Sequence, residues 1–235
     1  MTTYNDRRIP FPSAVAGQTS AFLNAVYGWM CFGLIVTAGT AWYTASSPTL
    51  VRTILTNGPV FWGLACVQLA IVFVLSARVQ QLSSTTAAIL FIGYSALTGL
   101  SLSFMVLAYT GESIATTFLV SGGAFAALAI YGTTTQRSLS GLGQFLFMGL
   151  IGVVLASIVG IFWHSSALQF VLSFVGVIVF AGLTAYDAQR LAGMAREAPS
   201  GDASSYAIVG ALALYLDFMN LFLFLLRFTG NRRQQ

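Results

Sequence analysis

Seven long runs of hydrophobic residues make up most of the chain, and polar residues are confined to the stretches around them. The runs lie at about 22–44, 59–77, 86–109, 113–131, 142–163, 167–186 and 206–228. A helix needs about 20 apolar residues to cross the hydrocarbon layer of a bilayer, and each run is about that long. A transmembrane β-barrel would instead show alternating segments of about 10 residues, which we do not find. The pattern predicts an all-α membrane protein, with seven transmembrane helices in one domain over 22–228.

Polar segments flank and separate the runs. A polar tail, 1–21, precedes the first run, and a short basic tail, 229–235, follows the last. Two connections, 110–112 and 164–166, are so short that we expect runs three and four, and runs five and six, to form antiparallel hairpins. The one longer interior connection is expected at 187–205.

Small residues recur at every fourth position in two of the runs. They are Ser95, Gly99 and Ser103 in the third run, and Gly152, Ala156 and Gly160 in the fifth. Helices in lipid use such stripes to bring their backbones close together. We therefore expect both stripes to be helix-packing faces.

Composition supports a membrane protein and excludes several chemistries. Of the 235 residues, 57% are hydrophobic and 7% are charged, whereas a soluble domain carries about 25% charged residues. All ten basic residues are arginine, and the absence of lysine excludes a Walker-type phosphate loop and a lysine Schiff base. One histidine and two cysteines are too few for a Cys/His metal cluster. We expect the lipid bilayer as a partner, and no nucleic acid.

The distribution of arginines predicts the orientation in the membrane. Six lie on the side of the N-terminal tail: Arg7, Arg8, Arg78, Arg137, Arg190 and Arg196. Four lie on the other side: Arg52, Arg227, Arg232 and Arg233. Because cytoplasmic segments carry the excess of arginine, we expect a cytoplasmic N-terminus, although the basic C-terminal tail argues in the opposite direction.

Two aspartates are the candidate functional residues. Asp217 is the midpoint of the last run, where a carboxylate is costly unless it is protonated, paired or hydrated. Asp187 follows the end of run six, close to Arg190. The two acids can meet only if run six extends about a turn deeper. Alternatively, Asp187 is a solvated loop residue and Asp217 is hydrogen-bonded within the bundle.

The topology brings a further cation to the same side, because Arg78 follows the end of run two. We therefore predict that Arg78, Asp187 and Asp217 lie together. Two carboxylates in contact at a site of low dielectric share a proton and titrate as a pair. An adjacent guanidinium competes with that proton, so protonation of the pair would release the arginine and allow a helix to move.

Four segments carry a resemblance to a known family. They are Tyr109 to Ser113 (YTGES), Tyr131 to Gly152 (YGTTTQRSLSGLGQFLFMGLIG), Tyr186 to Gln189 (YDAQ) and Leu214 to Phe228 (LYLDFMNLFLFLLRF). In their order and spacing the chain resembles the Bax inhibitor-1 family, in its bacterial branch. The resemblance implies an inner-membrane protein whose last helix is central and wrapped by the other six.

The resemblance also implies a function. Family members are described as pH-sensitive calcium leak pathways and as regulators of cell death or membrane-protein quality control. Their acid pair corresponds to Asp187 and Asp217, and the arginine that holds the first acid in the closed form corresponds to Arg78. Calcium would be the transported ion, with no other cofactor. Two carboxylates make only a weak calcium site, and weak binding suits a leak.

Glu112, in the short turn between runs three and four, is a candidate entrance for cations or a solvated turn residue. Three functions remain open: a proton-gated cation leak, a non-enzymatic partner of a membrane protease or another membrane protein, and an intramembrane aspartyl protease. The second aspartate of such proteases follows a Gly-x-Gly pattern, whereas Asp217 follows Leu214-Tyr215-Leu216. We therefore expect a protein that is not an enzyme.

Overall fold

The computed structural model describes residues 12–163, 165–197 and 203–233, and all of its named elements are helices. The helices are α1 (Pro12–Ala45), α2 (Pro48–Thr56), α3 (Gly58–Ala77), α4 (Ser84–Ala108), α5 (Gly111–Thr134), α6 (Ser140–Phe162), α7 (Ser166–Glu197) and α8 (Ala203–Thr229), with a 3-10 turn, η1 (Val79–Gln81), before α4. Within these residues, seven helices are long and apolar enough to cross a membrane. The predicted seven-helix membrane fold is confirmed.

The additional helix, α2, was not predicted. It is a short amphipathic helix between the first two spans: Ile54 is buried, while Arg52 and Thr53 are exposed. Pro48 begins it, where the N–H that proline lacks would have no partner within the helix. Its nine residues are too few to cross the bilayer, so it does not appear as a long apolar run in the sequence.

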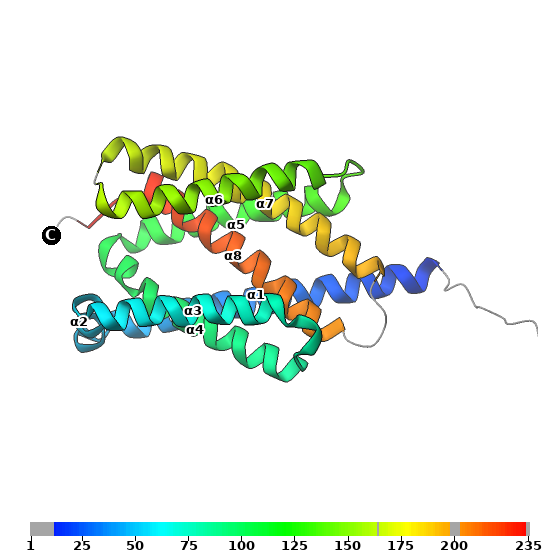
Figure 1. Cartoon of the computed structure of the whole chain (residues 1–235), viewed down its shortest axis with the longest axis horizontal. Coiled ribbons are helices and arrows are strands. Elements are labelled where there is room, and N and C mark those ends of the chain that lie inside the picture. The colour runs from blue at the N-terminus through cyan, green and yellow to red at the C-terminus, as the bar shows by residue number, and fades with distance from the viewer. Residues whose placement is uncertain (1–11, 164, 198–202, 234–235) are drawn as a thin grey trace, which may run out of the picture.

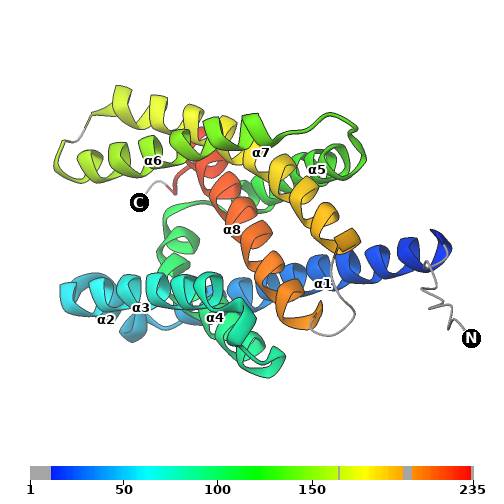
Figure 2. The same cartoon turned by 45° about the vertical axis from the view of Figure 1, so that its right-hand side comes forward.

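Helix α8 is central, as predicted. It packs against α1, α4, α5 and α7, and it is the most buried of the seven long helices. Figures 1 and 2 show it crossing the middle of the molecule, with α1, α3 and α4 on one side and α5, α6 and α7 on the other. Helix α6 packs mainly on α7 and contributes side chains, among them Leu146, to a buried group that includes Leu221 of α8.

Only one of the two predicted hairpins forms. Helices α6 and α7 pack side by side, and residue 164 in their connection lies outside the described residues. Helices α4 and α5 do not pack along their lengths, because they lie on different sides of α8. The C-terminal tail inserts at their turn: Thr110 N donates to Asn231 O at 3.2 Å, and Arg233 N donates to Ala108 O at 3.0 Å. A short turn brings two helix ends together, but it does not make the helices neighbours.

The expected interior connection at 187–205 is also wrong, because α7 continues to Glu197. Ala188, Leu191 and Ala195 are buried, and this spacing continues the apolar stripe of an amphipathic helix beyond the end of the hydrophobic run. Polar residues between them interrupt the hydrophobic run, although the helix continues. Residues 198–202 lie outside the described part of the chain.

At some of the predicted positions, small residues allow two helices to approach each other closely. A Cβ atom on Gly99 of α4 would lie 2.5 Å from the carbonyl oxygen of Thr37 on α1, so the first predicted stripe is a packing face. The second stripe is a packing face only in part: Gly152 is exposed and has no neighbour within 4 Å of a Cβ position, whereas Ala156 packs against the buried side chains around Leu146. A close approach that was not predicted joins Gly132 of α5 to the backbone of Ala185 on α7.

Candidate functional site

The two aspartates lie at a cavity of about 800 Å³ that is lined by α6, α7 and α8. Helix α7 packs against both of the other helices, whereas α6 and α8 do not pack along their lengths, and the cavity occupies the space between them. Polar lining residues are Gln144, Tyr186, Asp187, Arg190, Asp217 and Asn220. Exposed apolar side chains of α6, Phe147 and Met148, complete the wall.

Asp217 is the buried acid of the site. It lies near the middle of α8, and its side chain is 5% exposed. Its Oδ2 atom is buried and has no hydrogen-bond donor among the described residues. A buried carboxylate oxygen without a donor is costly in a membrane interior. Protonation of this oxygen, or a hydrogen-bond donor or cation at it, would remove that cost.

Asp187 faces this acid from α7. Its side chain is partly buried, and the carboxyl groups of Asp187 and Asp217 lie within hydrogen-bonding reach of each other. Because ionised carboxylates only accept hydrogen bonds, one of the two must carry a proton for this contact to be favourable. The extension of α7 past residue 186 puts Asp187 in a helix rather than a loop and brings the two acids, which we call the acid pair, together.

The cation beside the acid pair is Arg190, three residues after Asp187 on the same helix. Its guanidinium acts electrostatically on the Asp187 carboxylate, and Arg190 lines the cavity. Arg190 itself is exposed, so this interaction is screened by solvent.

Arg78 does not join this site, which corrects the predicted grouping. It is exposed at the end of α3 and does not line the cavity. The segment after it is fastened to the start of α8, where Ser205 Oγ donates to Leu82 O at 3.0 Å. Asp217 comes twelve residues later, about 18 Å along the helix axis. Leu82, four residues after Arg78, is therefore fastened to α8 more than three helical turns from the buried acid.

Gln189 fixes the loop before α6 to α7, next to the acid pair. Its Oε1 atom accepts from Leu139 N at 2.8 Å, and its Nε2 atom donates to Arg137 O at 2.9 Å. Gly143 of α6 lies against the ring of Tyr186. Sequence reasoning did not find this role for Gln189, since a single amide side chain carries no distinctive pattern.

A second polar group holds the opposite face of α8. The hydroxyls of Thr37 on α1 and Tyr215 on α8 form a buried hydrogen bond of 2.7 Å. Thr37 Oγ1 also donates to backbone carbonyl oxygens, including that of Ser95 on α4. Tyr215 and Asp217 are two positions apart, which is about 200° around a helix. The Tyr215 contact therefore sets the rotation of α8 that points Asp217 towards α7.

Oxygen atoms for a cation are available at the acid pair. Asn220 lines the same cavity and donates through Nδ2 to Leu216 O at 2.8 Å, which leaves its amide oxygen free to accept. Two carboxyl groups and one amide match the oxygen ligands that calcium prefers, but they are fewer than the 6–8 it takes. Within the part of the chain that the structure describes, no group of three or more His, Cys, Asp or Glu side chains suits a metal ion.

Glu112 lies apart from this cavity. It is exposed in the first turn of α5, at the end of the molecule where the C-terminal tail meets Thr110. It is not among the residues that line the acid-pair cavity. The structure thus places Glu112 at an outer surface, separate from the acid pair.

Known proteins with similar sequences place the chain in a family. Residues 19–234 match the family described as "Inhibitor of apoptosis-promoting Bax1". The inner membrane protein YbhL of Escherichia coli K12 is 52% identical over 215 residues, which cover 90% of this chain and 92% of YbhL. An uncharacterised protein of Deinococcus radiodurans is 43% identical over 92% of both chains, and one of Borreliella burgdorferi is 42% identical over 90% of this chain and 92% of its own. The chain therefore belongs to the Bax inhibitor-1 family and is a multi-pass protein of the bacterial inner membrane.

Proposed function

We propose that this protein is a pH-sensitive cation leak pathway, gated by the acid pair on α7 and α8. The observation that carries the proposal is the contact between the carboxyl groups of Asp187 and Asp217 at a cavity within the membrane-spanning helices. A group that gains or loses a proton there changes the charge of the cavity by one unit, in surroundings where charge is poorly screened. Few other buried side chains in the described spans can gain or lose a proton.

The gating step is a competition between a proton and a guanidinium for Asp187. When Asp187 is ionised, its attraction to Arg190 on the same helix stabilises that charge, and the carboxylate accepts a charge-assisted hydrogen bond from protonated Asp217 of α8. When the acid pair takes up another proton, this hydrogen bond between the two helices becomes a weaker neutral one, and α7 is freer to move relative to α8. The family resemblance assigns the arginine role to Arg78, which requires a different arrangement of the helices from this one. Arg190 fits the present geometry.

The transported ion is proposed to be calcium. Carboxylate and amide oxygens at Asp187, Asp217 and Asn220 suit a hard divalent cation. An incomplete ligand set holds the ion weakly, and an ion must leave its site readily for conduction to occur. The choice of calcium over other cations follows from the family resemblance.

Flux measurements on the purified protein in liposomes test this function. We expect calcium flux that varies with pH, and Asp187→Asn or Asp217→Asn should remove most of the variation, since asparagine keeps the shape but does not titrate. Glu112→Gln serves as the matched control, because it removes a carboxylate outside the cavity and should preserve the pH profile. A smaller flux at every pH in that variant would support a role for Glu112 as the cation entrance. An identical pH profile in the parent and both asparagine variants would refute gating by the acid pair.

The second candidate is a non-enzymatic regulator that acts on a membrane protease or another membrane protein. It predicts no flux from the purified protein in liposomes. An aspartyl protease is the third candidate, since such enzymes also use two aspartates that share a proton. Hydrolysis of a transmembrane peptide in the same liposomes, abolished by either asparagine variant, would favour the protease over both other functions.

A further inference from the structure

A second cavity, of about 770 Å³, is lined by α1, α5 and the end of α7. It shares no lining residue with the acid-pair cavity. Helices α1 and α5 do not pack along their lengths, although each packs against both α7 and α8. The cavity is the space left between them at the inner end of the molecule, meaning the end where α1 begins and α7 ends.

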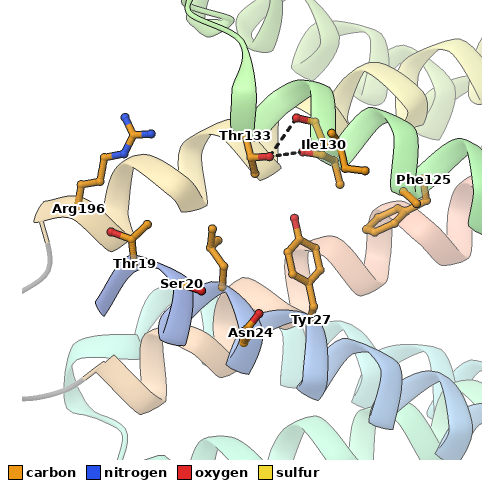
Figure 3. A pocket seen from close by; sticks show the side chains of 11 residues that line it. Thr19, Ser20, Asn24, Tyr27, Phe125, Ile130, Thr133 and Arg196 are labelled. Carbon is orange, nitrogen blue, oxygen red and sulfur yellow. Dashed lines mark hydrogen bonds between the residues drawn. The ribbon is translucent and has the colours of Figure 1, made fainter. Parts of the chain in front are cut away.

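The lining carries a cationic side chain at one end of the cavity and an aromatic ring at the other. Arg196, in the last turn of α7, and Thr133, near the end of α5, lie at the inner end. Ala126 and Phe125 lie deeper along α5, and Phe125 is about 12 Å from Thr133 along the helix axis. Figure 3 shows Arg196 at one end of the cavity and the ring of Phe125 at the other. The cavity therefore matches an amphiphile whose polar group lies at the inner end.

Hydrogen-bond donors at the cavity are available to a ligand. Arg196 is exposed and forms no ion pair with the residues that the structure describes. The same description shows no partner for the Tyr27 hydroxyl or the Asn24 amide, both of which line the cavity. The Thr133 hydroxyl, in contrast, is already used, because it donates to the backbone carbonyls of Ala129 and Ile130, each at 3.0 Å. Figure 3 shows Tyr27 beside Phe125, so Arg196 is the donor at the inner end, and a guanidinium without an ion pair suits an anionic group rather than a cationic one.

We propose that this cavity binds one anionic phospholipid, with its phosphate at Arg196 and an acyl chain between α1 and α5. The arginine distribution places this end in the cytoplasm, where anionic lipid attracts basic residues close to the membrane. A cavity of this volume is in the range of about 300–1,000 Å³ that small-molecule sites occupy. Free phosphate would use the polar end alone and leave the apolar part around Phe125 without a ligand.

Native mass spectrometry of the full chain in detergent, with added lipid, tests the phosphate contact. We expect phosphatidylglycerol to be retained more strongly than phosphatidylcholine. Arg196→Gln should weaken retention of phosphatidylglycerol about fivefold, the effect of one arginine near an anionic surface. Arg137→Gln is the matched control, because Arg137 is exposed at the same end but does not line the cavity. Equal retention of the two lipids by the parent, or equal losses in the two variants, would overturn the proposal.

A second variant tests the position of the acyl chain. Ala126 lines the cavity and is exposed, so Ala126→Phe fills the space without entering the protein core. We expect this variant to lose most retention of phosphatidylglycerol while unfolding at the temperature of the parent. Unchanged retention in Ala126→Phe would show that the lipid binds elsewhere. Inorganic phosphate that displaces the lipid completely at millimolar concentration would show a simple anion site instead, and would also overturn the proposal.

Discussion

Individual side chains decide how α8 is oriented and which acids meet. Tyr215 and Asp217 project from nearly opposite faces of α8, one towards a hydroxyl on α1 and the other towards α7. Asp187 then meets Asp217 only because α8 is held in this rotation. The polar contacts on the two faces are therefore coupled through one rigid helix.

The first prediction at this scale concerns the two arginines. Arg190→Gln should let the protein conduct at pH values where the parent is closed, because the attraction that favours ionised Asp187 is lost. Arg190 is exposed, so we expect a change of at most about fivefold in flux. Arg78→Gln removes the same charge at the same end of the molecule and should behave as the parent. The reverse result, with Arg78→Gln open and Arg190→Gln closed, would show that the closed state has a different helix arrangement.

A further prediction at the residue scale concerns the hydrogen bond between Thr37 and Tyr215. Tyr215→Phe should lower the free energy of unfolding by about 1 kcal/mol, the usual contribution of one buried hydrogen bond. Thr37→Val should lower the free energy of unfolding less in the Tyr215→Phe background than in the parent, because the two hydroxyls share that hydrogen bond. Denaturation in detergent measures both effects. Tyr43→Phe is the control, because Tyr43 is 72% exposed. Additive losses in the double variant would argue against the contact.

Helix packing at the scale of elements depends on two glycines that allow backbones to touch. Gly132 lets α5 approach the carbonyl of Ala185 on α7, two residues before Asp187. Gly99 does the same between α4 and α1. Because α7 carries Asp187, its distance from α5 bears on the geometry of the acid pair.

Gly132→Ala should lower the free energy of unfolding by about 1–3 kcal/mol, because its Cβ would overlap backbone atoms and α5 and α7 would have to separate. Gly123→Ala, on the same helix, meets nothing within 4 Å and should be neutral or stabilising by up to about 1 kcal/mol. Thermal unfolding in detergent distinguishes the two variants. Equal stability of both would mean that the α5–α7 approach is less tight than described.

The arrangement of the whole molecule places the start of α1 and the end of α8 at opposite ends, as seven crossings require (Figure 1). In a variant without Cys31 and Cys66, we expect Gly17→Cys to react with a membrane-impermeant thiol reagent only from the cytoplasm. Asn231→Cys should react only from the other side. Both positions are exposed, and the excess of arginine at the N-terminal end sets the expected direction. Labelling of both from one side would require a different number of crossings.

The site was predictable only in part. Asp217 could be identified from the sequence, because an acid at the midpoint of an apolar run is unusual whatever surrounds it. Asp187 could be identified, but its place in a helix could not be predicted. Helix α7 continues past it through buried residues such as Leu191 and Ala195, which are separated by polar residues. The predicted place of Arg78 was wrong, because two helices that end on the same side of the membrane need not be in contact there.

The sequence by itself determined the seven spans, their lengths and the membrane class, because transfer of an apolar segment into lipid depends on local composition. It also determined that Asp217 had to be surrounded by protein, since lipid offers a carboxylate no partner. Only the tertiary structure decided that α4 and α5 separate around α8 and that Arg190, rather than Arg78, lies beside the acid pair. These features depend on contacts between helices that are distant in sequence, and lipid-facing and protein-facing apolar residues look alike in a hydropathy pattern.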